Sequence, residues 1–397
     1  MNTPIANPAL RDKYAVVGTG VSQLGKVPEQ SALGLTEDAC ANALIDAGLS
    51  AKDIDGLLIR GPDDIYTFHQ VVGERLGINA SFSTTTANGG ASQILSVIMA
   101  VMAIDAGLAT TVLCGYGRNA WSRSHANETT KLRSSTRSEE MDSSEFGPEY
   151  GLYGAPAMHA FGAQRHMHEF GTTREQFGAI SLAFREHAMR NPVAQMRDKP
   201  LSMEDYLAAR MIVDPFCLLD CSLRSDAAGA VIVTSAERAK DMKQTPVLIK
   251  GFGTHNNLQG WFAGDNMIRT AAGPSGKTAY AMAGLSPSDI SCAQIYDCFT
   301  YMVLAQLEDY GFCEKGAGGA FVESGALALN GALPTNTSGG QLSEAHAEGM
   351  LQIVEGVRQL QGIYGPDRQV KNAETCLVSG HGGNTVCHST LILGVAS

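Results

Sequence analysis

The sequence predicts an α/β fold made of two similar halves, because three stretches of the first half recur in the same order in the second. The shared features are a Gly-Leu-Ser turn before a strand, a Gly-Gly turn before a helix, and a strand that ends in Gly-x-Gly. The matched pairs are 47–59 with 283–295, 88–92 with 338–342, and 111–119 with 375–384. Strands that alternate with helices should bring their carboxyl ends to one shared site.

The first half is expected to cover residues 1–245 and to carry a long excursion at about 118–205. Within it, 121–153 is polar and holds neither a strand nor a helix period, whereas helical patterns follow it. We interpret the excursion as a cap over the site. The other expected elements are strands at 14–18 and within 224–234, and helices at 32–47, 94–106, 157–170, 174–189 and 203–211.

The second half is expected to cover residues 246–397 and contains the stretch that points most clearly to a site. In 336–349 a glycine pair is followed by Ser343, Glu344 and His346. Apolar residues then recur at helical spacing from Met350 to Leu360, so a buried helix should begin after Gly349. A histidine-bearing turn ahead of a buried helix is typical of an active-site wall, although a capped loop with a surface histidine would look the same.

Composition argues against several classes of partner. The 397 residues are 44% hydrophobic, and the formal net charge of -11 disfavours nucleic acid and anionic membrane surfaces. Residues 1–13 do not resemble a leader, and no apolar run reaches membrane-spanning length. We therefore expect a cytoplasmic protein.

The cysteines and histidines are not spaced like metal ligands. Nine cysteines form no paired CxxC array, so we expect neither a disulfide framework nor a zinc site. His159, His166 and His168 lie close together, but His166 and His168 would face different sides of a helix. We expect no bound metal.

Two loops resemble those of the thiolase superfamily, and the resemblance extends over the whole chain. Ile295-Tyr-Asp-Cys-Phe-Thr300 is similar to the His-Asp-Cys-Phe loop of the thiolases related to sterol carrier protein, and the stretch from Gly339 to His346 is similar to their Gly-Gly…Gly-His-Pro loop. The resemblance implies a five-layered α-β-α-β-α thiolase fold with two duplicated halves and an inserted loop domain.

The chain departs from that family where a thiolase carries its cysteines. Gly90 occupies the position of the nucleophilic cysteine, and Val378 or Ser379 occupies that of the second cysteine. Glycine offers neither a nucleophile nor a base, and Cys298 and Cys387 are poor substitutes because neither lies at the first-half helix start. The chain thus resembles the thiolase-like side-chain aldolases, which cleave a β-hydroxyacyl-CoA into a carbonyl compound and a shorter acyl-CoA.

A retro-aldol reaction needs a base for the β-hydroxyl proton and a pocket for the thioester enolate. Either Tyr296 or His346 is the expected base, and the other would polarise an oxygen. His381 is expected to reprotonate the enolate carbon, and Asp297 to orient its loop. Backbone groups of five glycines are the expected oxyanion donors: Gly89, Gly90, Gly340, Gly380 and Gly382.

Two other functions stay open. One is a cysteine-independent acyltransferase or a subunit of a heteromeric thiolase, and the other is a non-catalytic acyl-CoA or lipid carrier. Coenzyme A is expected only as part of the substrate, without a further cofactor, and a steroid, an aromatic or a branched acyl group would fit equally. The resemblance also implies a homodimer formed through 81–91 and a small partner protein with a zinc ribbon and an OB-fold.

Overall fold

The computed structural model describes residues 6–62, 65–126, 152, 154–257, 267–383 and 386–396. Nine strands form one sheet in the order β3-β2-β4-β7-β1-β8-β11-β10-β9. They are β1 (Tyr14–Val21), β2 (Gly56–Arg60), β3 (Phe82–Thr84), β4 (Thr111–Asn119), β7 (Asp226–Ser235), β8 (Val247–Asn256), β9 (Cys292–Gln294), β10 (Thr375–Gly382) and β11 (Cys387–Gly394).

The helices alternate with these strands in both halves. They are α1 (Ala32–Ala47), α2 (Phe68–Leu76), α3 (Ser92–Asp105), α4 (Ala120–His125), α6 (Gly154–Phe170), α7 (Arg174–Arg190), α8 (Met203–Ala208), α9 (Ala236–Ala239), α10 (Ala272–Ala283), α11 (Thr300–Asp309), α12 (Gly318–Glu323), α13 (Gly340–Ser343) and α14 (Met350–Gln361).

The strand order repeats about the centre of the sheet. β2, β4, β7 and β1 follow one another in the first half, as β9, β10, β11 and β8 do in the second. In the first half β3 lies beside β2. At the equivalent place in the second half, Thr335 forms a parallel bridge with Ala293 of β9. The halves meet where β1 pairs with β8 at only two positions, Ala15 with Leu248 and Val16 with Val247.

Side-chain chemistry explains why one repeated segment folds alike in both halves. Gly48 and Gly284 both end a helix in the left-handed conformation, with φ of 71° and 65°. The following turn is closed in each half by a capping box, Ser50 with Asp53 and Ser286 with Asp289. The Gly-Leu-Ser-x-x-Asp pattern therefore delivers the chain into β2 and β9 in the same way.

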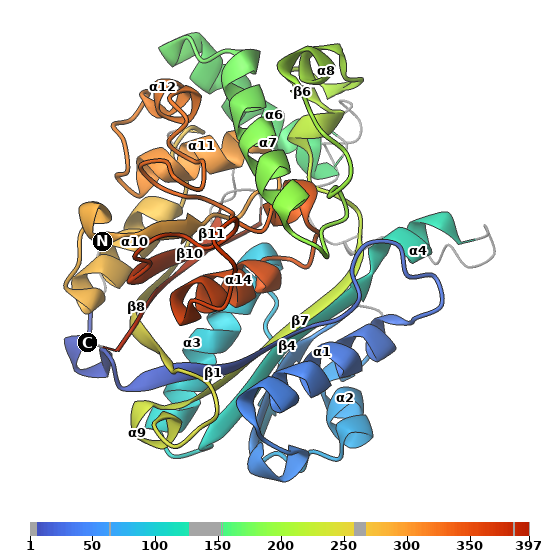
Figure 1. Cartoon of the computed structure of the whole chain (residues 1–397), viewed down its shortest axis with the longest axis vertical. Helices are drawn as coiled ribbons and strands as arrows, with labels where there is room; N and C mark the ends of the chain where they lie inside the picture. The colour runs from blue at the N-terminus through green and yellow to red at the C-terminus, as the bar shows by residue number, and fades with distance from the viewer. Residues whose placement is uncertain are drawn as a thin grey trace.

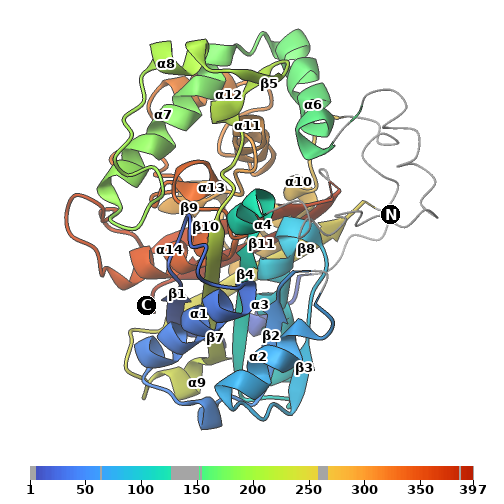
Figure 2. The same cartoon turned by 90° about the vertical axis from the view of Figure 1, so that its right-hand side faces the viewer.

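The elements stack in the five predicted layers (Figures 1 and 2). Helices α3 and α14 lie between the two parts of the sheet, and both pack against β7 and β10. Helix α1 covers the outer face of the first half through β1, β4 and β7, while α10 covers β8 and β11 of the second. Apolar side chains of α3 and α14 belong to one central core together with side chains from strands of both halves. This shared core holds the two helices next to the strands of both halves.

The cap is built from α6, α7 and α8, which pack over α11 and α12 at one end of the molecule (Figure 1). Phe177, Phe184 and Phe216 are buried here with Tyr206 and Tyr301. The helix predicted at 203–211 ends at Ala208, because Met211–Val213 form β5, which pairs with β6 (Phe216–Cys217). Of the polar stretch predicted at 121–153, residues 127–151 and 153 lie outside the described residues.

None of the helices in the described ranges combines the length and the apolar character needed to cross a membrane.

Candidate active site

The predicted site residues gather around the loop that joins β9 to α11. This loop carries Tyr296 and Asp297, and the glycine turns that precede α3 and α14 approach it from the two halves. The end of β10 lies beside the first turn, because a Cβ atom added at Gly380 would come within 2.9 Å of the carbonyl oxygen of Gly90. Elements from three parts of the chain thus meet at one point.

Gly90 leaves the space that the phenol ring of Tyr296 fills. A Cβ atom added at residue 90 would collide with the ring and with its hydroxyl, closer than the 3.0 Å that real Cβ atoms keep. The Tyr296 hydroxyl therefore stands where the side chain of residue 90 would begin. Burial, with a further effect of the Glu348 charge, raises the pKa of Tyr296 well above its ordinary value, so the phenol is protonated at neutral pH.

A clamp of hydrogen bonds fixes the backbone of Tyr296. Its N–H donates to Ser379 Oγ at 2.8 Å, and its carbonyl accepts from Gln306 Nε2 at 2.8 Å. Ser379 Oγ in turn donates to Gln306 Oε1 at 2.6 Å, which closes the ring of contacts. Ser379 is one of the two positions matched to the second thiolase cysteine, and here it holds the tyrosine.

Asp297 connects its loop to the second-half glycine turn. Its fully buried carboxylate accepts the backbone N–H groups of Gln341 (3.0 Å) and Leu342 (3.1 Å) and the side-chain amide of Gln352 (2.9 Å). Burial raises the pKa of Asp297 to about 6, while these backbone donors act in the opposite direction. The N–H of Gly340 donates to Ser338 Oγ at 3.3 Å, so this predicted oxyanion donor is engaged within its own loop.

His346 lies in the loop between α13 and α14, where its tautomer can be assigned. Its Nδ1 lies 3.3 Å from the carbonyl oxygen of Leu223 and 3.2 Å from Ser222 Oγ. Because a carbonyl only accepts, we assign the proton to Nδ1, which leaves the lone pair on Nε2. Burial lowers the pKa of His346, so the ring is neutral at neutral pH.

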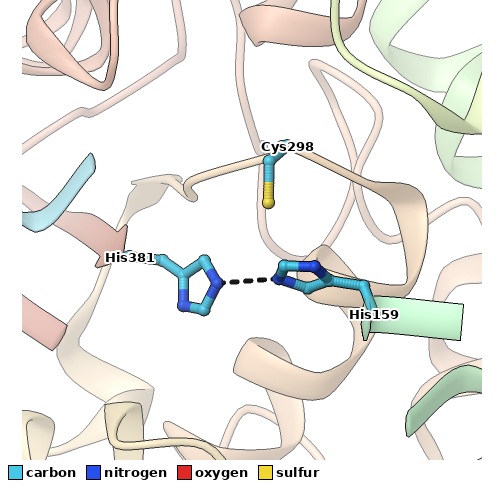
Figure 3. A group of neighbouring side chains, drawn as sticks. All are labelled: His159, Cys298 and His381. Carbon is cyan, nitrogen blue, oxygen red and sulfur yellow. Dashed lines mark hydrogen bonds between the residues drawn. The ribbon is translucent and has the colours of Figure 1, made fainter. Parts of the chain in front are cut away.

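His381 pairs with a histidine from the cap, His159 of α6 (Figure 3). Their Nε2 atoms are 3.1 Å apart, and His159 Nδ1 lies 2.8 Å from the carbonyl oxygen of Ala155. The carbonyl requires a proton on His159 Nδ1, so His159 Nε2 accepts and His381 Nε2 donates. The lone pair of His381 then lies on Nδ1, which has no hydrogen-bond partner among the described residues.

Sequence reasoning missed two members of this site. Sequence proximity groups His159 with His166 and His168, whereas its partner is 222 residues away in sequence. Glu348 adopts a left-handed conformation, with φ of 45°, and forms ion pairs with Arg60 (3.2 Å) and Arg118 (3.5 Å). Glu348 could have been recognised from the sequence, because it is a charged residue directly before Gly349 in the 336–349 stretch.

A second buried carboxylate ties the cap to the His346 loop. Glu344 accepts hydrogen bonds from Asn191 Nδ2 at 2.9 Å and from Ser338 Oγ at 2.6 Å. Burial, followed by the nearby charge of Glu355, raises the pKa of Glu344 to about 7. Because Asn191 follows α7, this contact fixes the loop relative to the cap.

Comparison with protein families and curated proteins agrees with the predicted superfamily. The family model described as thiolase C-terminal domain-like matches residues 253–395. The 17-hydroxy-3-oxo-4-pregnene-20-carboxyl-CoA lyase of Mycobacterium tuberculosis is 37% identical over 97% of this chain and 100% of its own length. The steroid side-chain-cleaving aldolase of Thermomonospora curvata is 35% identical over 96% of this chain and 97% of its own length.

Solved structures agree with the predicted fold. The Ltp2-ChsH2(DUF35) aldolase superposes with a TM-score of 0.86 at 35% identity, covering 97% of this chain and 98% of the other. Human mitochondrial 3-ketoacyl-CoA thiolase, at 17% identity, shares the fold with a TM-score of 0.69 over 98% of this chain and 100% of its own. The chain belongs to the thiolase superfamily and, within it, to the thiolase-like aldolases.

Proposed function

We propose that this protein is a carbon–carbon lyase that cleaves a β-hydroxyacyl-CoA with a steroid acyl group into a ketone or aldehyde and a shorter acyl-CoA. The observation that carries the proposal is the phenol of Tyr296 standing where residue 90 would place a nucleophile. A phenol that its raised pKa keeps protonated can donate to an oxygen but is a poor nucleophile for acyl transfer. The two curated relatives, named for cleavage of steroid compounds, support the acyl class.

His346 is the better base of the two residues considered. Its neutral ring with the lone pair on Nε2 can accept the β-hydroxyl proton, whereas the raised pKa of Tyr296 disfavours a phenolate. Tyr296 is then the residue that donates a hydrogen bond to a substrate oxygen.

The reaction balances without another reactant. His346 takes the β-hydroxyl proton, the oxygen lone pair forms the new carbonyl, and the Cα–Cβ bonding electrons pass into the thioester enolate. Backbone N–H groups of the Gly89–Gly90 turn are the proposed donors to the enolate oxygen. The register of β10 with β11 directs the N–H groups of Gly380 and Gly382, two further predicted donors, to the carbonyl oxygens of β11. One proton returns to Cα, with His381 as the proposed relay, so coenzyme A enters with the substrate and no further cofactor is required.

Acyl transfer through another cysteine is disfavoured. Burial raises the pKa of the Cys298 and Cys387 thiols above the ordinary value, so neither is a thiolate at neutral pH. An acyltransferase would therefore have to work without any of the covalent chemistry that defines thiolases.

Two assembly features belong to the proposal. The strand β3 lies at the edge of the nine-stranded sheet, and its open side suits pairing with a second copy through 81–91. The solved Ltp2-ChsH2(DUF35) aldolase is named for two components, the second of which is a DUF35 protein. We infer that this chain also acts with a small partner of that kind.

The test is incubation with a panel of β-hydroxyacyl-CoA esters in the absence of free coenzyme A, with and without a DUF35 partner protein. We expect release of a shorter acyl-CoA and a ketone or aldehyde, reduced by about 10³-fold in Tyr296→Phe. Tyr301→Phe is the matched control, because the Tyr301 hydroxyl is also buried but has no hydrogen-bond partner among the described residues.

Acyl transfer that appears only when free coenzyme A or another acceptor is added would contradict the lyase. Cleavage that survives Tyr296→Phe at the level of the Tyr301→Phe control would contradict the role of the phenol.

A further inference from the structure

Three side-chain atoms of metal-binding type converge beside the site, from segments far apart in sequence. They come from His159 in α6, His381 in β10 and Cys298 in the loop after β9, and one ligand atom of each lies within 4.8 Å of the others. The Nε2 atoms of the two histidines are 3.1 Å apart. In Figure 3 the two imidazoles face each other through their Nε2 atoms, and the thiol points into the space beside them. The reaction described above makes no use of Cys298.

The spacing is close to that of a tetrahedral site. Zinc binds imidazole nitrogen at about 2.0–2.1 Å and thiolate sulfur at about 2.3 Å. Tetrahedral angles then place two nitrogens about 3.3 Å apart, and a sulfur about 3.5 Å from each. The observed separation of the two Nε2 atoms is 3.1 Å, and the three ligand atoms lie within 4.8 Å of one another. Binding of an ion therefore requires the two rings to open and the Cys298 side chain to turn toward them.

The surroundings favour coordination over a simple hydrogen bond. His159 donates its other N–H to the carbonyl of Ala155, which is the second contact that metal-binding histidines usually make. His381 Nδ1 has no partner among the described residues, so its ring can move its proton from Nε2 to Nδ1 without breaking another bond.

We propose that His159, Cys298 and His381 form a binding site for a thiophilic divalent cation of the zinc class, and that its occupancy stops the lyase. One thiolate and two imidazoles are ligands that zinc prefers, and three ligands leave a fourth position for water. On binding, the Cys298 thiol releases its proton to solvent, the His381 proton moves to Nδ1, and three bonds to the ion form. The inhibition, which rests on the proposed function, follows because His381 loses the lone pair that would relay a proton.

The test uses Co²⁺ as a spectroscopic stand-in for Zn²⁺ on the full chain without its partner, since a zinc ribbon would add metal of its own. We expect one equivalent of Co²⁺ with thiolate-to-cobalt charge-transfer absorbance, displaced by Zn²⁺. Cys298→Ser should remove that absorbance, and His159→Gln should weaken binding by at least about tenfold. Cys313→Ser is the matched control, because Cys313 is also partly buried but lies outside the group.

Absence of a thiolate band in the wild-type chain, or its survival in Cys298→Ser, would overturn the site. X-ray absorption of the zinc-loaded wild-type chain needs no variant, and coordination without sulfur would overturn it equally. These readouts need no substrate, so they separate failure of the metal site from failure of the proposed lyase. If the site is confirmed, full lyase activity with the ion bound would refute the inhibition.

Discussion

The two glycine turns of the duplicated fold face neighbouring residues of one loop, yet they make room for different side chains. Gly90, ahead of α3, makes room for the ring of Tyr296, and Gly340, at the start of α13, makes room for the carboxylate of Asp297. An added Cβ atom would collide with the facing side chain in both halves. The same backbone arrangement therefore admits a phenol in one half and an acid in the other.

The difference lies in the hydrogen bonds. Asp297 accepts three, two of them from the second-half turn itself, whereas the Tyr296 hydroxyl makes none with the described part of the chain. A carboxylate that accepts several hydrogen bonds from the protein stabilises the loop. A hydroxyl without a hydrogen-bond partner in the described part of the chain remains available to a substrate. The comparison favours a structural role for Asp297 and agrees with the proposed catalytic role of the adjacent Tyr296.

Gly90→Ala should break the first-half arrangement with the largest effect. The added methyl group would displace the Tyr296 ring, and we expect kcat/KM for the β-hydroxyacyl-CoA to fall by about 10³-fold. Steady-state kinetics on the substrate found in the panel measures this fall. Gly365→Ala is the control, because a Cβ atom there meets nothing within 4 Å. Wild-type kinetics in Gly90→Ala would contradict the steric argument.

Asp297→Ala should break the second-half arrangement through stability. Removing the carboxylate leaves two backbone N–H groups and one side-chain amide without an acceptor, and we expect a loss of about 3 kcal/mol in the free energy of unfolding. Tyr296→Phe should change it by less than about 0.5 kcal/mol. Urea denaturation of both variants measures the contrast, and equal losses would refute the division of roles.

Glu344→Gln should sharpen the comparison by showing that the second-half loop is held by buried groups. The folded pKa of Glu344, about 7, is above its ordinary value of 4.5, so the folded state binds more protons and stability falls as pH rises from 4.5 to 7. Glutamine does not ionise, so the variant should lose this slope and gain about 2 kcal/mol at pH 8 relative to wild type.

Unfolding free energies measured from pH 4.5 to 8 test this expectation. Glu355→Gln is the opposing control. Although burial raises the pKa of Glu355, the Arg368 charge and hydrogen bonds lower it overall, so its removal should destabilise the chain at neutral pH. A wild-type slope that persists in Glu344→Gln would contradict the assignment.

Ser379→Ala should have the smallest effect, on the clamp behind Tyr296. It removes the acceptor of the Tyr296 N–H and the bond to Gln306, which should cost about 1 kcal/mol of stability and lower kcat several-fold with little change in KM. Ser389→Ala on β11 is the control, because Ser389 is equally buried but its side chain bonds, within the described ranges, only to Thr254. Identical kinetics for the two variants would show that the clamp does not position the phenol.

The duplicated fold was accessible from the sequence because it rests on local chemistry. The Gly-Leu-Ser-x-x-Asp pattern closes the same turn in both halves, and the apolar spacing from Met350 to Leu360 predicts α14 closely. The extent of the helix after Ser202 was predicted less well, since β5 depends on pairing with β6 rather than on periodicity.

The site was accessible only in part. Tyr296, Asp297, His346 and His381 follow from their loops, but the reason for Gly90 required the position of the Tyr296 ring. The pairing of His381 with His159 joins two segments that no spacing rule connects. Contacts between distant segments depend on how the cap packs, and one sequence does not reveal that.

The position of the Tyr296 ring also limits which substitutions could change the chemistry of this fold during evolution. A cysteine introduced alone at position 90 would collide with the phenol, and loss of the phenol alone would leave a hole with no nucleophile in it. We expect each single step to yield a protein that neither transfers acyl groups nor cleaves the carbon–carbon bond. Passage between the two activities therefore requires coordinated changes at positions 90 and 296, in addition to the second thiolase cysteine that this chain lacks.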